Sequence, residues 1–141
     1  MNFLVDTDVI STARKEPRGG TVRDAVESIP DENFFLSVVT MGEIAKGIER
    51  LDEGSKRGEL NKWYVQIANS VAERILPIDL PTAHAWGELT ARCQRQGITV
   101  PTSDGLIAAT AIRHGMTVMT MNARHFEGTG ARTIDPTAVG G

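Results

Sequence analysis

The stretch FLVDTDVI, residues 3–10, places two carboxylates directly after a short apolar run. Apolar residues in a row predict a short buried strand over residues 2–5, which ends at Asp6. Residues 8–14 can then form a short helix. Pro17 follows soon after and is expected to stop it. Two acidic side chains at this place indicate a turn, a helix cap, a phosphoryl-accepting nucleophile with its acid partner, or part of a metal site.

The rest of the chain alternates apolar, strand-like runs with amphipathic segments. Strands are expected at residues 34–37, 75–79, 116–121 and 132–134, and helices at residues 21–29, 59–74, 81–96 and 103–114. Thr40 and Glu43 have the spacing of a capping box and predict a further helix that starts there. This alternation predicts an α/β fold with a central parallel sheet of about four or five strands flanked by helices. Because no linker divides the chain, one domain over residues 1–141 is expected.

Composition and charge narrow the class of protein. The net charge of -3 and the pI of about 5.6 disfavour a protein that coats nucleic acid through a general basic field. They remain compatible with a nuclease, since acidic ligands lower the net charge and bound cations restore it locally. We expect a cytoplasmic protein without a membrane segment or signal peptide, because no apolar run is long enough and Cys93 has no partner for an internal disulfide.

Four side chains stand where predicted strands meet predicted helices, namely Asp6, Glu43, Asp104 and Asn122. Each alone has a structural explanation: a helix cap, a capping-box partner, a complement to a helix dipole, or a turn former. The three carboxylates together have a further implication. Gathered at the carboxyl edge of a parallel sheet, they would repel one another unless they were protonated or bound a cation.

The chemistry of such a cluster favours a hard divalent cation. All-oxygen ligands suit Mg²⁺ or Mn²⁺, and the three histidines lack partners at the spacing of a zinc site. A carboxylate-bound divalent ion implies phosphoryl chemistry, because it activates water, orients the scissile phosphate and stabilises the leaving oxygen.

One alternative starts from the same stretch. FLVDTDVI also satisfies the Asp-x-Asp pattern of a haloacid-dehalogenase-type phosphatase, in which Asp6 would be the nucleophile and Asp8 the general acid. Such an enzyme also needs a lysine against the phosphate and a late acidic pair that binds Mg²⁺. Lys46 and Lys62 lie in helical patterns, neither Asp-Asp nor Asp-x-x-x-Asp follows residue 104, and Glu43 would have no role.

Four segments in order carry a family pattern over nearly the whole chain. They are LVDTDVIS (4–11), SVVTMGEIAKGI (37–48), DGLIAATA (104–111) and MTVMTMNARHF (116–126). In this order and spacing they resemble the PIN-domain ribonucleases, specifically the VapC-type toxins of type II toxin–antitoxin systems. The tail FEGTGARTIDP, which begins at Phe126, resembles the branch similar to FitB.

The resemblance implies Mg²⁺-dependent endonucleolytic hydrolysis of RNA by metal-activated water, with Mn²⁺ able to substitute. It implies that Asp6, Glu43 and Asp104 hold the metal and that Asn122 supports catalysis. Thr7, Asp8 and Thr120 would surround the metal ligands. The chain departs from the family at two positions, because Asp8 stands where Asn is frequent and Asn122 stands where an acid is frequent.

The resemblance also implies partners: an RNA substrate, a cognate antitoxin and a second copy of the chain in a homodimer. An antitoxin arginine that entered the acidic site would replace the charge of the metal. The apolar helices at 21–29 and 59–74 are candidates for the partner-facing surface. Basic side chains beside the motifs are candidates for RNA contact: Arg14, Lys15, Lys46 and Arg50. The remaining alternative is a catalytically weak PIN module that only binds a partner, because Asn122 supplies no charge.

Overall fold

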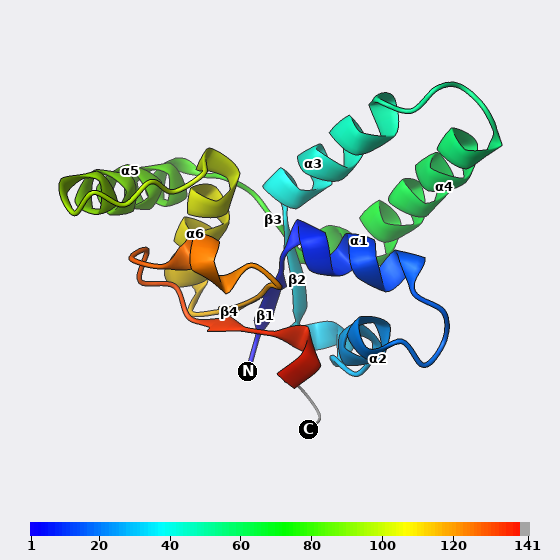
Figure 1. The fold of residues 1–141 in the computed structure, drawn as a ribbon, viewed down its shortest axis with the longest axis horizontal. Coiled ribbons are helices and arrows are strands. Elements are labelled where there is room, and N and C mark those ends of the chain that lie inside the picture. The colour runs from blue at the N-terminus through cyan, green and yellow to red at the C-terminus, as the bar shows by residue number, and fades with distance from the viewer. Residues whose placement is uncertain (139–141) are drawn as a thin grey trace.

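The computed structural model describes residues 1–138 and contains a five-stranded parallel sheet covered by helices on both faces (Figure 1). The strands are β1 (Phe3–Val5), β2 (Phe34–Ser37), β3 (Ile75–Leu76), β4 (Thr117–Met119) and β5 (Thr133–Ile134). They lie side by side in the order β3-β2-β1-β4-β5, so β1 is the central strand. The predicted α/β fold with a central parallel sheet is confirmed.

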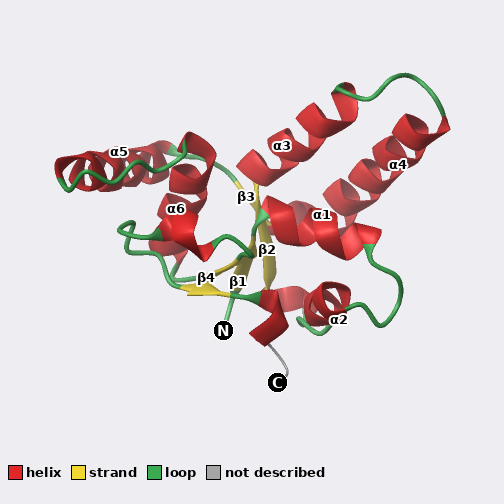
Figure 2. Cartoon of the chain, viewed as in Figure 1, coloured by secondary structure: helices red, strands yellow, loops and turns green. Residues whose placement is uncertain are grey.

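Within residues 1–138, six α-helices connect the strands (Figure 2): α1 (Thr7–Lys15), α2 (Thr21–Glu27), α3 (Val38–Glu49), α4 (Ser55–Ser70), α5 (Leu80–Arg95) and α6 (Thr102–His114). Short 3₁₀ turns occur at η1 (Asp31–Asn33), η2 (Ala72–Arg74), η3 (Ala123–Phe126) and η4 (Pro136–Ala138). None of the helices in this described part combines the length and the apolar character that a membrane span requires.

The sheet separates two hydrophobic clusters. One cluster packs β1, β2 and β4 against α1 to α4, and the other packs them against α5 and α6. Successive residues of a strand point to opposite faces, so Val5 belongs to the first cluster and Leu4 to the second, and both are fully buried. This burial on both faces explains why the central strand is a continuous apolar run in the sequence.

Helix α3 begins earlier than the sequence pattern predicts. Ser37, the last residue of β2, also caps the helix, because its hydroxyl oxygen accepts a hydrogen bond from the backbone N–H of Val39 at 3.0 Å. Thr40 therefore lies inside the helix and is fully buried, and Glu43 lies in the second turn. The predicted capping box of Thr40 and Glu43 is wrong, since the strand passes into the helix without a connecting loop.

The largest remaining differences from the predicted boundaries are in α4 and β3. Helix α4 covers Ser55–Ser70, and the 3₁₀ turn η2 forms separately after it, whereas the pattern predicted one helix over residues 59–74. Strand β3 ends at Leu76, well before the predicted end at Asp79. The carboxylate of Asp79 instead caps α5 by accepting a hydrogen bond from the backbone N–H of Thr82 at 3.0 Å.

The central strand yields a stability prediction. The substitution Leu4→Ala is expected to lower the free energy of unfolding by about 3 kcal/mol, because it leaves a cavity in a fully buried cluster. Urea denaturation of the wild type and the variant measures the loss. Val65→Ala serves as the control, since Val65 is 54% exposed on α4, and it should change stability by less than about 0.5 kcal/mol. Equal losses for the two variants would contradict the assignment of Leu4 to the core.

Candidate acidic site and partner groove

The candidate site residues lie at the carboxyl edge of the sheet. Asp6 follows β1 directly, α3 with Glu43 follows β2, and Asn122 belongs to the loop after β4. Helix α6 contributes Asp104 from its first turn. The strand order runs outward in opposite directions from β1 and β4, and the crevice beyond such a switch point is the usual ligand site of an open parallel sheet.

Asp6 is the most buried carboxylate of the site, with 5% of its surface exposed. It caps α1, and its Oδ1 accepts a hydrogen bond from the backbone N–H of Thr7 at 2.8 Å. Its Oδ2 accepts a hydrogen bond from the hydroxyl of Thr120 at 2.8 Å. The Thr120 oxygen in turn accepts the backbone N–H of Asn122 at 3.0 Å. These contacts hold Asp6 between β1, α1 and the loop after β4.

Glu43 is connected to α1 through two hydroxyl groups. The Thr7 hydroxyl donates to Glu43 Oε1 at 2.6 Å, and Thr7 Oγ1 lies 3.1 Å from Thr40 Oγ1. Because a hydroxyl has one proton to donate, the Thr40 hydroxyl donates to Thr7. The chain of contacts from Thr40 through Thr7 to Glu43 therefore fixes the start of α1 against α3. Sequence reasoning treated Thr40 only as a helix cap and missed this contact.

Asp8 also points toward the site edge. Its Oδ2 accepts hydrogen bonds from the side-chain amide of Asn122 at 2.7 Å and from the backbone N–H of Met121 at 3.2 Å. Asp8 therefore joins the first turn of α1 to the loop after β4. Asp6, rather than Asp8, is the cap of the helix.

Asp104 has a histidine partner that the sequence did not reveal. Nδ1 of His125 lies 3.1 Å from Oδ2 of Asp104, and His125 belongs to the 3₁₀ turn η3. In the sequence His125 is isolated from the other histidines, so it has no partner at metal-ligand spacing. The signal that could have placed it is its position three residues after Asn122, in the same loop.

The carboxylates influence one another electrostatically. Burial raises the pKa of Asp6 to about 7, the Asp8 carboxylate adds to the rise, and hydrogen bonds from Thr120 and Thr7 oppose it. Burial also raises the pKa of Asp104; His125 opposes that rise, and the Glu43 carboxylate adds to it. Four carboxylates therefore interact electrostatically, namely Asp6, Asp8, Glu43 and Asp104.

The donor chemistry of this site fits a hard divalent cation. The acidic side chains and Asn122 offer only oxygen ligands, and a cation would relieve the repulsion between the carboxylates. Asp8 Oδ1 is buried and has no hydrogen-bond partner among residues 1–138. In that part of the chain, no three His, Cys, Asp or Glu side chains are grouped as a ready-made metal site. The roles of the site residues remain predictions. The predicted metal ligands are Asp6, Glu43 and Asp104, the predicted supporting residues are Thr7, Asp8 and Thr120, and the predicted catalytic residue is Asn122.

Comparison with known proteins identifies the fold family. The family model described as PIN domain matches residues 3–130. The chain belongs to the PIN domain family.

Two relatives and one solved structure resemble this PIN domain over nearly its whole length. VapC ribonuclease Y4jK of Sinorhizobium fredii is 31% identical, and the match covers 95% of this chain and 96% of the relative. Toxin FitB of Neisseria gonorrhoeae is also 31% identical, with 95% and 97% covered. The solved structure of FitAB bound to an IR36 DNA fragment has a TM-score of 0.88 at 32% identity, with 96% of this chain and 95% of that chain covered. The resemblance to VapC-type and FitB-like proteins is confirmed.

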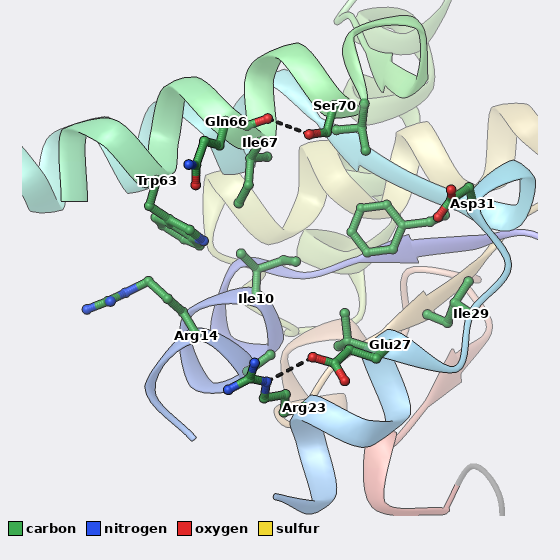
Figure 3. Close-up of a pocket in the computed structure, with 14 residues that line it drawn as sticks. Ile10, Arg14, Arg23, Glu27, Ile29, Asp31, Trp63, Gln66, Ile67 and Ser70 are labelled. Carbon is green, nitrogen blue, oxygen red and sulfur yellow. Dashed lines mark hydrogen bonds and ion pairs between the residues drawn. The ribbon is translucent and has the colours of Figure 1, made fainter. Parts of the chain in front are cut away.

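The PIN domain also carries a groove away from the acidic site. A cavity of about 600 Å³ lies between α1, α2 and α4 (Figure 3). Ile10 of α1 and Ile67 of α4 form part of its apolar wall, and Arg14 lies over the Trp63 ring at 5.6 Å from its centroid. None of the residues of α4, all of which the structure describes, is fully buried, so the apolar face of this helix is partly open to solvent.

The raised pKa of Asp6 predicts how stability depends on pH. Between about pH 4 and about pH 7 the folded protein keeps a proton on Asp6 that the unfolded chain, with a pKa of 3.8, has released. The stability from this group is therefore complete below pH 4 and is lost as the pH rises toward 7. In EDTA-containing buffer, Asp6→Asn is expected to flatten the fall in the free energy of unfolding over this interval, as urea titrations at each pH would measure. Asp24→Asn, which changes an exposed acid in the first turn of α2, should keep the wild-type slope. An unchanged slope in Asp6→Asn would show that Asp6 is ionised throughout.

Proposed function

We propose that the protein is a Mg²⁺-dependent endoribonuclease, with Mn²⁺ able to substitute. In this proposal Asp6, Glu43 and Asp104 hold the cation, and Asn122 supports catalysis. The acidic cluster at the carboxyl edge of a PIN domain is the observation that carries it. Partly buried carboxylates that raise one another's pKa are unfavourable without a neutralising cation. A relative that matches nearly the full chain is named a ribonuclease, which supports RNA as the substrate.

The chain's own residues would prepare the site for the cation. A bound divalent ion would lower the pKa of a water molecule and would stabilise negative charge on the phosphate. Thr120 and the backbone of Thr7 orient the Asp6 carboxylate, and the Thr7 hydroxyl orients Glu43. Ligands fixed in this way lose little freedom when a cation binds. The amide nitrogen of Asn122 is engaged by Asp8, so its amide oxygen remains the acceptor that can face a ligand or water.

The proposed reaction is tested by RNA cleavage. The purified protein, free of antitoxin, should cut structured RNA in Mg²⁺ and lose this activity in EDTA. Asp104→Asn and Glu43→Gln should each lower the cleavage rate by more than about 100-fold, beyond the loss typical of residues that only support a metal ligand. Asp24→Asn, which removes one exposed carboxylate far from the motifs, should cleave like the wild type.

Three outcomes would overturn the ribonuclease proposal. Equal cleavage by wild type, Asp104→Asn and Glu43→Gln would identify a contaminating nuclease. Hydrolysis of phosphomonoesters that depends on Asp6 but survives Glu43→Gln would instead indicate an aspartyl-phosphate enzyme, because only that mechanism leaves Glu43 without a role. Absence of both activities together with absence of Mg²⁺ or Mn²⁺ binding would favour a module that only binds a partner.

We further propose that this ribonuclease is the toxin of a toxin–antitoxin pair, that it forms a homodimer, and that its cognate antitoxin occupies the groove between α1, α2 and α4. The relative from Neisseria gonorrhoeae is named a toxin, and the similar solved structure contains FitAB. The groove supports the proposal because apolar side chains of three helices line it, and an amphipathic helix docks on a surface of this kind. The predicted partner-facing ranges 21–29 and 59–74 both line it.

The groove yields a binding prediction. Trp63→Ala is expected to weaken binding of the purified cognate antitoxin by about tenfold or more, because a large aromatic side chain in an apolar groove is a typical interface anchor. Isothermal titration calorimetry measures the affinity, and urea denaturation checks that the variant remains folded. Lys62→Ala, on α4 but outside the groove, is the control and should bind like the wild type. Unchanged affinity in folded Trp63→Ala would place the antitoxin elsewhere.

A further inference from the structure

Asp8 is the carboxylate of the site whose role the proposed function leaves open. It lies in the first turn of α1, where an acid is favourable to the helix dipole and needs no other partner. Asp24 also lies in the first turn of its helix, α2, and is exposed. Asp8 differs from it, because it reaches across to the loop after β4 and contacts Asn122 and Met121. A dipole role alone does not explain that contact.

The two oxygens of Asp8 have different surroundings. Oδ2 accepts two hydrogen bonds, whereas Oδ1 is buried and has no protein donor anywhere in residues 1–138. A buried carboxylate oxygen without a donor or a cation is costly in free energy. Burial is the main cause of the raised pKa of Asp6 and of Asp104, and the Asp8 carboxylate adds to both rises, so it interacts electrostatically with both acids.

Asp8 and Asn122 form a complementary pair. The amide of Asn122 donates to the carboxylate of Asp8 at 2.7 Å. A carboxylate at both positions would place two like charges in contact, and an amide at both positions would remove the charge from this side of the site. One acid and one amide therefore satisfy the contact, and in this chain the acid is on the helix and the amide is on the loop.

We propose that Asp8 holds the divalent cation through its free Oδ1 and supplies the negative charge that Asn122 does not. This inference rests on the proposed ribonuclease site and adds a fourth acidic residue to it. Oδ2 keeps its contacts to the loop, so Asp8 both binds the cation and positions Asn122 beside it.

The test is Mn²⁺ affinity, which is measured without RNA. Isothermal titration calorimetry with the full-length, metal-free protein should show that Asp8→Asn weakens Mn²⁺ binding by about tenfold or more. Asp24→Asn is the matched control, since it removes the same charge from the first turn of another helix, and it should bind Mn²⁺ like the wild type. In metal-free buffer Asp8→Asn should melt at the wild-type temperature or above it, because it removes repulsion against Asp6.

Exchanging the pair separates the charge from the structural contact. In the double variant Asp8→Asn/Asn122→Asp, the amide at position 8 can donate to the carboxylate at position 122, so contact and charge are both retained. Its Mn²⁺ affinity should return to within about threefold of the wild type. A double variant as weak as Asp8→Asn would overturn the inference, because the charge would then not be what position 8 supplies.

Asp104→Asn distinguishes failure of the inference from failure of the proposed function. If Asp104→Asn loses Mn²⁺ binding and Asp8→Asn retains it, the ribonuclease site stands and Asp8 is not a ligand. If the wild type binds no Mn²⁺, or binds it equally well after Asp104→Asn, both the proposed metal site and the role of Asp8 are overturned.

Discussion

The hydrogen bond from the Thr120 hydroxyl to the buried Asp6 carboxylate is the contact on which the acidic site depends. It joins the residue that follows β1 to the residue that follows β4, beside the backbone bond from the N–H of Asp6 to the carbonyl of Met119 at 2.9 Å. A carboxylate needs its charge to bind a cation, but burial at the sheet edge opposes ionisation. The hydroxyl of Thr120 and the N–H of Thr7 oppose that effect of burial.

Each of the other carboxylates of the site also contacts a partner from a different element of the fold. The Thr7 hydroxyl of α1 donates a hydrogen bond to Glu43 of α3, and His125 of η3 lies beside Asp104 of α6. In the loop after β4, the side-chain amide of Asn122 donates a hydrogen bond to Asp8. The site therefore exists only when β1, β2 and β4 are paired, because the donor and the acceptor of each contact follow different strands.

Local sequence patterns predicted the strands and most helices because burial leaves a local signature. The fully buried Leu4 and Val5 form a continuous apolar run, and Gly115 ends α6 in the left-handed conformation at φ 65°. The contact between Asp8 and Asn122 joins residues 114 positions apart, and such pairing has no periodicity to detect. The capping error at Thr40 has a related cause, since its hydroxyl serves Thr7 of another helix rather than the backbone of its own.

Helix α1 connects the acidic site to the groove. Its N-terminal end carries Asp6, Thr7 and Asp8, and the following turns present Ile10 and Arg14 to the groove. Because a helix rises about 1.5 Å per residue, Ile10 lies only about 6 Å further along the axis than Asp6. We expect a peptide that is seated against α1 and extends past its N-terminal end to reach the carboxylates, where an arginine would supply positive charge and bidentate donors in place of a metal ion. Occupancy of the groove and neutralisation of the acidic charge are therefore compatible in one partner, which is what an inhibitor of the proposed nuclease requires.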